Sequence, residues 1–100
     1  MPEMKTYVWN PAKNAQLKKE RGVSFEDVVF HIGAGDEVDL FDHPNKARYP
    51  NQKISVVMME GYAYFVPYIE SDTEIFLKTI IPSRKATKQY LDEESDDHEA

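Results

Sequence analysis

The chain contains no cysteine, so disulfides, a thiol nucleophile and thiolate metal sites are all excluded. It has no apolar run that approaches the roughly 20 residues needed to span a bilayer. The N-terminal sequence MPEMKTY also lacks the apolar stretch of a secretory signal. No HExxH zinc motif or glycine-rich phosphate loop is present. These absences predict a cytoplasmic protein that uses no membrane, metal or cofactor.

The remaining composition is that of one globular domain, with 100 residues, of which 41% are hydrophobic. The formal net charge of −6 comes from the C-terminal sequence LDEESDDHEA, which has six acidic residues and no lysine or arginine. Such a run cannot bury enough apolar surface to offset the entropy of ordering it. We therefore predict a single domain over residues 1–91 and a disordered acidic tail over residues 92–100.

Two helices are predicted after a short strand at residues 5–9. Asn10 is suited to cap the first helix, Pro11 fits its first position, and Gly22 is a typical stop. The second helix has Ser24 as its predicted N-cap and ends in a glycine-rich stretch at residues 33–35.

Strands are predicted at residues 37–42, 53–60, 62–68 and 73–81, with a tight hairpin at Glu60-Gly61. Pro67 predicts an edge position or a bulge, because proline cannot donate to a sheet. A last helix begins near Ser83. The order β–α–α–β–β–β–β–α predicts an α+β fold, with two N-terminal helices on a mostly antiparallel sheet and a C-terminal helix.

Tyrosines alternate along the predicted strand at residues 62–68. Tyr62, Tyr64 and Tyr68 are expected on one face of the sheet, with Phe65 on the other. Core packing and base stacking on an exposed sheet are both consistent with this pattern.

Three cations begin the last predicted helix: Arg84, Lys85 and Lys88. Arg84 and Lys88 are four residues apart and share a helix face, where like charges repel. Either solvent surrounds this face, or it binds an anionic ligand such as RNA phosphate. Arg84 is the best phosphate donor, because the planar guanidinium matches phosphate geometry.

A second group of polar residues follows the strand at residues 37–42. It contains a histidine, a tyrosine and three cations: His43, Lys46, Arg48, Tyr49 and Lys53. One interpretation is a turn-rich surface loop. The other is metal-free RNA cleavage, in which His43 or Tyr49 transfers protons. In this interpretation Arg84 holds the scissile phosphate or stabilises its transition state, and Arg48 and Lys53 add positive charge. The second interpretation predicts that Arg84, Arg48 and Lys53 converge on one pocket.

Three stretches together resemble the BrnT family of toxins, within the RelE/ParE superfamily. They are YVWNPAKNAQ at residues 7–16, RGVSFED at 21–27 and IFLKTIIPSRKATKQY at 75–90. The resemblance covers roughly residues 6–91 and rests on the order and spacing of short motifs. It places Arg84 and Lys85 on the basic pair of the family and Lys53 on a basic residue that opens a central strand.

The resemblance implies a RelE/ParE-like fold and the toxin of a type II toxin–antitoxin pair, typically a ribonuclease that inhibits translation. The partner it implies is a ribbon–helix–helix antitoxin, through which alone the complex would contact operator DNA. The alternative is a non-catalytic relative of the same fold that binds a partner protein.

Overall fold

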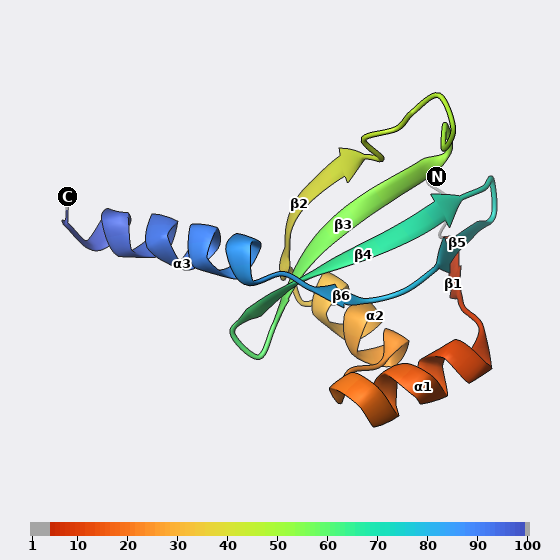
Figure 1. Cartoon of the computed structure of the whole chain (residues 1–100), viewed down its shortest axis with the longest axis horizontal. Coiled ribbons are helices and arrows are strands. Elements are labelled where there is room, and N and C mark those ends of the chain that lie inside the picture. The colour runs from red at the N-terminus through yellow and green to blue at the C-terminus, as the bar shows by residue number, and fades with distance from the viewer. Residues whose placement is uncertain (1–4, 100) are drawn as a thin grey trace.

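The computed structural model describes residues 5–99, and for residues 92–99 it describes the backbone only. This part of the chain forms six strands and three helices (Figure 1). In chain order they are β1 (Thr6–Val8), α1 (Pro11–Arg21), α2 (Phe25–Gly33), β2 (Glu37–Asp42), β3 (Gln52–Met59), β4 (Tyr62–Glu70), β5 (Glu74–Leu77), β6 (Ile81–Pro82) and α3 (Arg84–Glu99).

The strands form one open sheet in the order β1-β5-β4-β3-β2, and the short strand β6 pairs with β4. Only the β1–β5 pair is parallel, and the other pairs in this sheet are antiparallel. The predicted α+β class with a mostly antiparallel sheet is therefore confirmed. β3 and β4 pair along eight residues and form the long central hairpin on which the other elements are placed.

Local capping sets the first two helices. The Asn10 side chain accepts hydrogen bonds from the backbone N–H groups of Ala12 and Lys13, and Pro11 begins α1 as predicted. Gly22 ends α1 with a φ of 69°, a left-handed conformation that favours glycine. Ser24 caps α2 in a capping box with Asp27, which satisfies two backbone donors at once.

Helices α1 and α2 cover one face of the sheet, which we call the helix face. Here the helix residues Leu17, Phe25 and Val28, each at most 1% exposed, pack on side chains of β3, β4 and β5. Burial of apolar side chains of this size contributes about 1.5–3 kcal/mol each, so this layer contributes strongly to the stability of the domain. The strand residues in the cluster are Val57, Met59, Val66, Tyr68 and Leu77.

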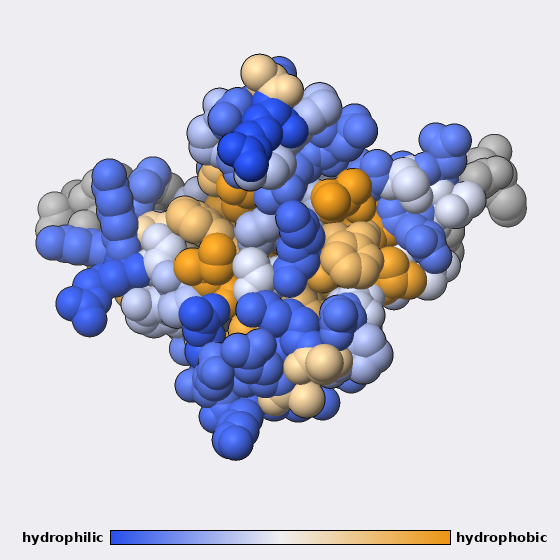
Figure 2. Space-filling model, turned by 45° about the vertical axis from the view of Figure 1, so that its right-hand side comes forward, coloured by the Kyte–Doolittle hydropathy of each residue, from blue (hydrophilic) through white to orange (hydrophobic). Residues whose placement is uncertain are grey.

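The opposite face, which we call the open face, is covered at one end by α3. Ala86 of α3 packs there on Val56 and Ala63. Farther along the sheet, strand register places several large apolar side chains on the open face, and each is more than a third exposed. They are Phe41, Ile69, Phe76 and Ile81. Figure 2 shows apolar side chains gathered across the middle of one side of the molecule, with polar side chains around them.

The β3–β4 hairpin turns at Glu60-Gly61, as predicted. Glu60 has a φ of 56° and Gly61 a φ of 76°. Two successive positive φ values match the twist of a tight antiparallel hairpin. The register of this hairpin places Tyr64 and Tyr68 on the helix face and Phe65 on the open face, which confirms the predicted alternation.

The prediction of an edge position or a bulge at Pro67 is wrong. β4 lies in the middle of the sheet, and Pro67 pairs in regular register with Ile54. The Pro67 carbonyl accepts a hydrogen bond from the backbone N–H of Lys78, just after β5 ends. In an antiparallel pair the N–H and C=O of one residue point to the same side. The nitrogen of Pro67, which carries no hydrogen, therefore faces the interval between β5 and β6, where the ladder of hydrogen bonds is interrupted.

The single strand predicted at residues 73–81 is divided into β5 and β6, with Lys78–Ile80 between them. Ser83 caps the following helix, since its hydroxyl accepts a hydrogen bond from the backbone N–H of Ala86. Helix α3 extends away from the sheet (Figure 1), and its backbone continues through residues 92–99. The side chains of the acidic segment lie outside the described residues, so its role stays a prediction.

Candidate functional site

The loop between β2 and β3 brings His43, Arg48 and Tyr49 together. The His43 and Tyr49 rings lie 4.4 Å apart between centroids, and the Arg48 guanidinium carbon lies 5.6 Å from the centre of the Tyr49 ring. Asn45 fixes the loop, because its side-chain oxygen accepts from the backbone N–H of Arg48 at 3.2 Å. Stacking of arginine on an aromatic ring limits the orientations available to the guanidinium. The structure thus brings together three of the five predicted catalytic residues.

The same loop determines how the His43 ring is oriented. Its Nδ1 accepts a hydrogen bond from the backbone N–H of Asn45 at 3.0 Å. A neutral imidazole that accepts at Nδ1 carries its proton on Nε2. Nε2 can therefore donate a hydrogen bond to a ligand, whereas Nδ1 is the nitrogen that can take up a proton.

Lys53 lies at the base of this loop on the helix face, beside an acidic group. In the strand register it is opposite Tyr68 on one side and Asp42 on the other. Its ammonium lies 3.7 Å from the Glu70 carboxylate, which also accepts a hydrogen bond from Lys5 at 2.8 Å. The hydrogen bond from Lys5 is the largest influence that lowers the pKa of Glu70 below its usual range. Glu70 therefore stays ionised and offsets part of the charge of Lys53.

The remaining loop cations differ in how far they are neutralised. Lys46 forms an ion pair with Asp42 at 3.2 Å. Arg48 is exposed and makes no ion pair with another described residue. Arg48 is therefore the loop cation best able to bind an external anion.

Arg84, Lys85 and Lys88 lie at the other end of the central hairpin. Ser83 is hydrogen-bonded through its backbone N–H to the carbonyl of Ala63, and Ala63 pairs with Met58 in β3. Met58 is five residues from Lys53 along the strand, which corresponds to roughly 17 Å. Figure 1 shows α3 leaving the sheet at the end away from the β2–β3 loop. The structure does not bring Arg84 together with Arg48 and Lys53, so the predicted single pocket is replaced by two separate basic regions. Within the loop region, Lys53 lies against Glu70, whereas Arg48 lines a different pocket with Tyr49 and Ile69.

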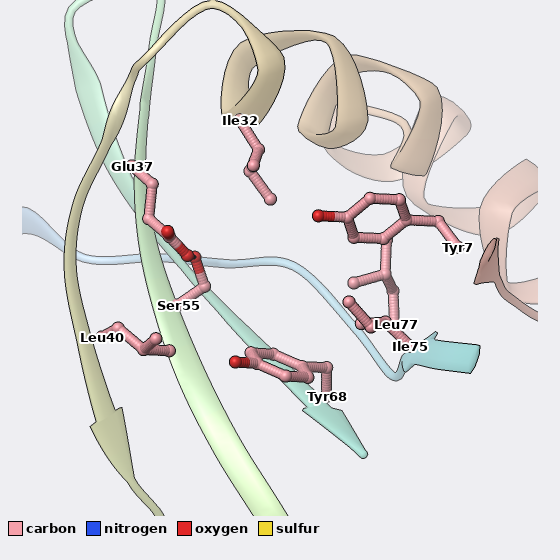
Figure 3. A pocket seen from close by; sticks show the side chains of 8 residues that line it. All are labelled: Tyr7, Ile32, Glu37, Leu40, Ser55, Tyr68, Ile75 and Leu77. Atoms are coloured by element: carbon pink, nitrogen blue, oxygen red, sulfur yellow. Dashed lines mark hydrogen bonds between the residues drawn. The ribbon is translucent and has the colours of Figure 1, made fainter. Parts of the chain in front are cut away.

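A pocket on the helix face was not predicted from the sequence, and we call it the Glu37 pocket. Its volume is about 190 Å³, and it lies between the end of α2 and the sheet (Figure 3). Residues from six elements, β1, α2, β2, β3, β4 and β5, line this pocket, so no short sequence motif predicts it. Only the alternation that placed Tyr68 on one sheet face gave a partial indication. The lining residues are Tyr7, Ile32, Glu37, Leu40, Ser55, Tyr68, Ile75 and Leu77.

The environment of the Glu37 pocket is apolar and negative. Burial is the main cause that raises the pKa of Tyr68 to about 12, with further increases from the charges of Glu70, Glu37 and Asp42. Burial, followed by the charges of Glu37 and Glu70, also raises the pKa of Tyr7. Both hydroxyls therefore remain protonated near neutral pH.

No family model, curated protein or solved structure matches this chain. Within the described residues, no three histidine, aspartate or glutamate side chains are grouped so that they could hold a metal ion. Among the helices described, none has both the length and the apolar character needed to cross a membrane.

Proposed function

We propose that the chain is the toxin of a type II toxin–antitoxin pair, a metal-independent ribonuclease that inhibits translation in the cytoplasm. The observation that carries this proposal is the contact of His43, Arg48 and Tyr49 in one loop, which leads into β3 near Lys53. A proton-transfer group, a guanidinium without an internal ion pair and an ammonium are the components of metal-free phosphodiester cleavage.

The fold supports a RelE/ParE-like assignment. The helix pair on one face of a mostly antiparallel sheet, followed by a C-terminal helix, is the arrangement that the resemblance to BrnT toxins implies. The three motifs of that resemblance fall at junctions of the fold: β1 to α1, α1 to α2, and β5 through β6 to α3. At these junctions they supply the N-caps Asn10, Ser24 and Ser83 and the residues that connect one element to the next.

In the proposed reaction the 2′-hydroxyl of RNA attacks its own 3′-phosphate. The new P–O bond closes a 2′,3′-cyclic phosphate, and the bond to the 5′-oxygen of the next nucleotide breaks. Arg48 would stabilise the additional negative charge on the phosphorane, and Lys53 would add positive charge at the base of the loop. His43 would take up the 2′-hydroxyl proton at Nδ1 as the substrate displaces the Asn45 N–H from that nitrogen, and would return the proton to the departing 5′-oxygen. Tyr49 would orient Arg48 and donate a hydrogen bond.

The second basic cluster has a different role in this proposal. Arg84, Lys85 and Lys88 lie too far from the loop to contact the same phosphate, so they would bind RNA phosphates away from the cleaved bond. Their contribution is to affinity and to its salt dependence. The partners implied are RNA, a ribbon–helix–helix antitoxin and, through the antitoxin alone, operator DNA.

The test is cleavage of RNA by the purified full chain in the presence of a metal chelator, with mapping of the new RNA ends. Arg48→Ala should lower the cleavage rate about a hundredfold, the usual effect of losing one transition-state donor. Arg84→Ala should mainly weaken RNA binding and reduce its salt dependence by about one phosphate contact. Lys19→Ala, an exposed cation of α1 outside both clusters, is the matched control.

A second function, that of a non-catalytic interaction protein, is favoured by the separation of Arg84 from the loop and by the exposed apolar side chains of the open face. Induced expression with and without the neighbouring gene product separates the two. Growth arrest with new RNA ends that are lost in Arg48→Ala supports the ribonuclease. A chain that binds its neighbour and produces no new RNA ends supports the interaction protein.

A further inference from the structure

The Glu37 pocket combines apolar walls with oxygen atoms directed at its interior. Ile32, Leu40 and Ile75 contribute aliphatic walls, whereas the Glu37 carboxylate and the hydroxyls of Tyr7 and Tyr68 contribute oxygens (Figure 3). The volume of about 190 Å³ equals roughly six water molecules at liquid density. A ligand that fits this pocket has a narrow apolar chain with a polar group at its end.

The charges around the pocket determine which ligand charge it favours. None of the residues that line the pocket is a lysine, arginine or histidine, and Glu37 is an acid. Lys53 pairs with Tyr68 in the strand register, and Lys5 and Lys53 are both held by Glu70, at 2.8 Å and 3.7 Å. The potential in the pocket is thus negative, which attracts a cationic group and repels a phosphate.

The hydrogen-bonding groups of the pocket determine which polar end group of a ligand it can bind. Glu37 accepts one hydrogen bond, from the Ser55 hydroxyl, which positions the carboxylate and leaves its other lone pairs available. In the part of the chain that the structure describes, no hydrogen bond to the Tyr7 or Tyr68 hydroxyl is present. A guanidinium carries five N–H donors and no acceptor, so it can satisfy a carboxylate and several hydroxyl oxygens together.

We propose that the Glu37 pocket binds an arginine side chain of a partner protein. The methylene stem lies against Ile32, Leu40 and Ile75, and the guanidinium forms charge-assisted hydrogen bonds with Glu37 and hydrogen bonds with the tyrosine oxygens. A guanine base offers similar donors, but its flanking phosphates would enter the same negative region. The inference goes beyond RNA cleavage, because the pocket lies outside the His43 loop and its occupant would be a protein.

The experiment is an NMR titration of the isotopically labelled full chain with three small probes. N-acetyl-argininamide tests the proposal, the neutral isostere N-acetyl-citrullinamide is the matched control, and guanosine 5′-monophosphate tests a base. We expect the arginine probe to shift the signals of Tyr7, Tyr68 and Ile75 with a roughly millimolar dissociation constant, because a ligand this small makes few contacts. The citrulline probe should bind at least about tenfold more weakly.

Variants locate the binding at this pocket. Glu37→Gln removes the charge with little change in shape and should weaken the arginine probe about tenfold, whereas Glu60→Gln, at the far hairpin turn, should leave its affinity unchanged. Should Glu37→Gln not fold, Leu40→Trp fills the mouth from a position that is 47% exposed and should block the probe. Equal binding of arginine and citrulline probes, a preference for the nucleotide, or no binding of any probe would overturn the proposal. Since RNA is absent from this titration, its failure is distinguishable from failure of the ribonuclease.

Discussion

The side chain of Asn14 in α1 is hydrogen-bonded to the backbone of Phe25 at the start of α2. Its Oδ1 accepts from the Phe25 N–H at 2.8 Å, and its Nδ2 donates to the Glu26 carboxylate, also at 2.8 Å. The N–H of Phe25 is one of the backbone donors that a helix cannot satisfy internally. One side chain therefore supplies the buried partner for α2 and fixes the angle between the two helices.

Removal of this contact should destabilise the whole domain. Asn14→Ala leaves the Phe25 N–H buried without a partner, which costs about 1–3 kcal/mol in the free energy of unfolding. Urea denaturation followed by circular dichroism measures the change. Gln16→Ala, on the exposed side of the same helix, should alter stability by less than about 0.5 kcal/mol. Equal stability of the two variants would contradict the role given to Asn14.

Thr87 attaches α3 to the sheet. Its hydroxyl accepts from the Ala63 N–H at 2.8 Å and donates to the Ser83 carbonyl at 2.7 Å. Thr87→Val keeps the shape but leaves the buried N–H unpaired, so we expect a loss of about 1–3 kcal/mol. Hydrogen exchange should become faster at Ala63 and in the first turns of α3. Thr87→Ser retains the hydroxyl and should retain protection at Ala63; loss of protection in both variants would show that the hydroxyl is not responsible.

The two phenylalanines of α2 should differ sharply in their effect on stability. Phe25 is 0% exposed and stacks on Trp9 with ring centroids 5.7 Å apart, whereas Phe30 is 70% exposed. Phe25→Ala opens a cavity in the core and should cost about 3–5 kcal/mol. Phe30→Ala should change stability by no more than about 0.5 kcal/mol. Thermal and urea unfolding of the pair test the assignment of the helix face, and similar losses in both variants would argue against it.

Tyr68 should make the domain sensitive to alkaline pH. Burial and the neighbouring acids raise the pKa of Tyr68 to about 12 in the folded chain, against about 10 for a tyrosine in an unfolded chain. Between these values the unfolded state releases a proton that the folded state retains, so stability falls as pH rises from about 10. Tyr68→Phe should flatten this decline in urea denaturation series at pH 9, 10 and 11. A decline of unchanged steepness would exclude Tyr68 as its source.

Local signals predicted the first two helices well because capping acts over only a few residues. Asn10 and Pro11 begin α1, Gly22 ends it, and Ser24 caps α2, each through hydrogen bonds or φ values set within four positions of the chain. The β2 bounds and the Glu60-Gly61 turn follow equally from short patterns of alternation and turn residues. These features need no knowledge of which strands are neighbours.

The candidate site could be predicted only in part. His43, Arg48 and Tyr49 are close in sequence, so a compact loop necessarily keeps them near one another. The distance from this loop to Arg84 depends on the length of the β3–β4 hairpin and on the end at which α3 begins. Neither the length of this hairpin nor the end at which α3 begins can be predicted from composition or charge spacing. The prediction that Arg84, Arg48 and Lys53 converge on one pocket was therefore wrong.

The amino-acid sequence by itself determined where the first two helices begin and end, which residues alternate across the strands, and which cations share the loop. Tertiary structure alone decided that Pro67 sits in a central strand, opposite a break in the ladder, and that Glu37, Ser55 and Tyr68 face one pocket. The physical reason is that capping and alternation are set by bonds between near neighbours in the chain. Strand order and the packing of α2 over the sheet arise from apolar contacts between distant segments, which act on the folded chain as a whole.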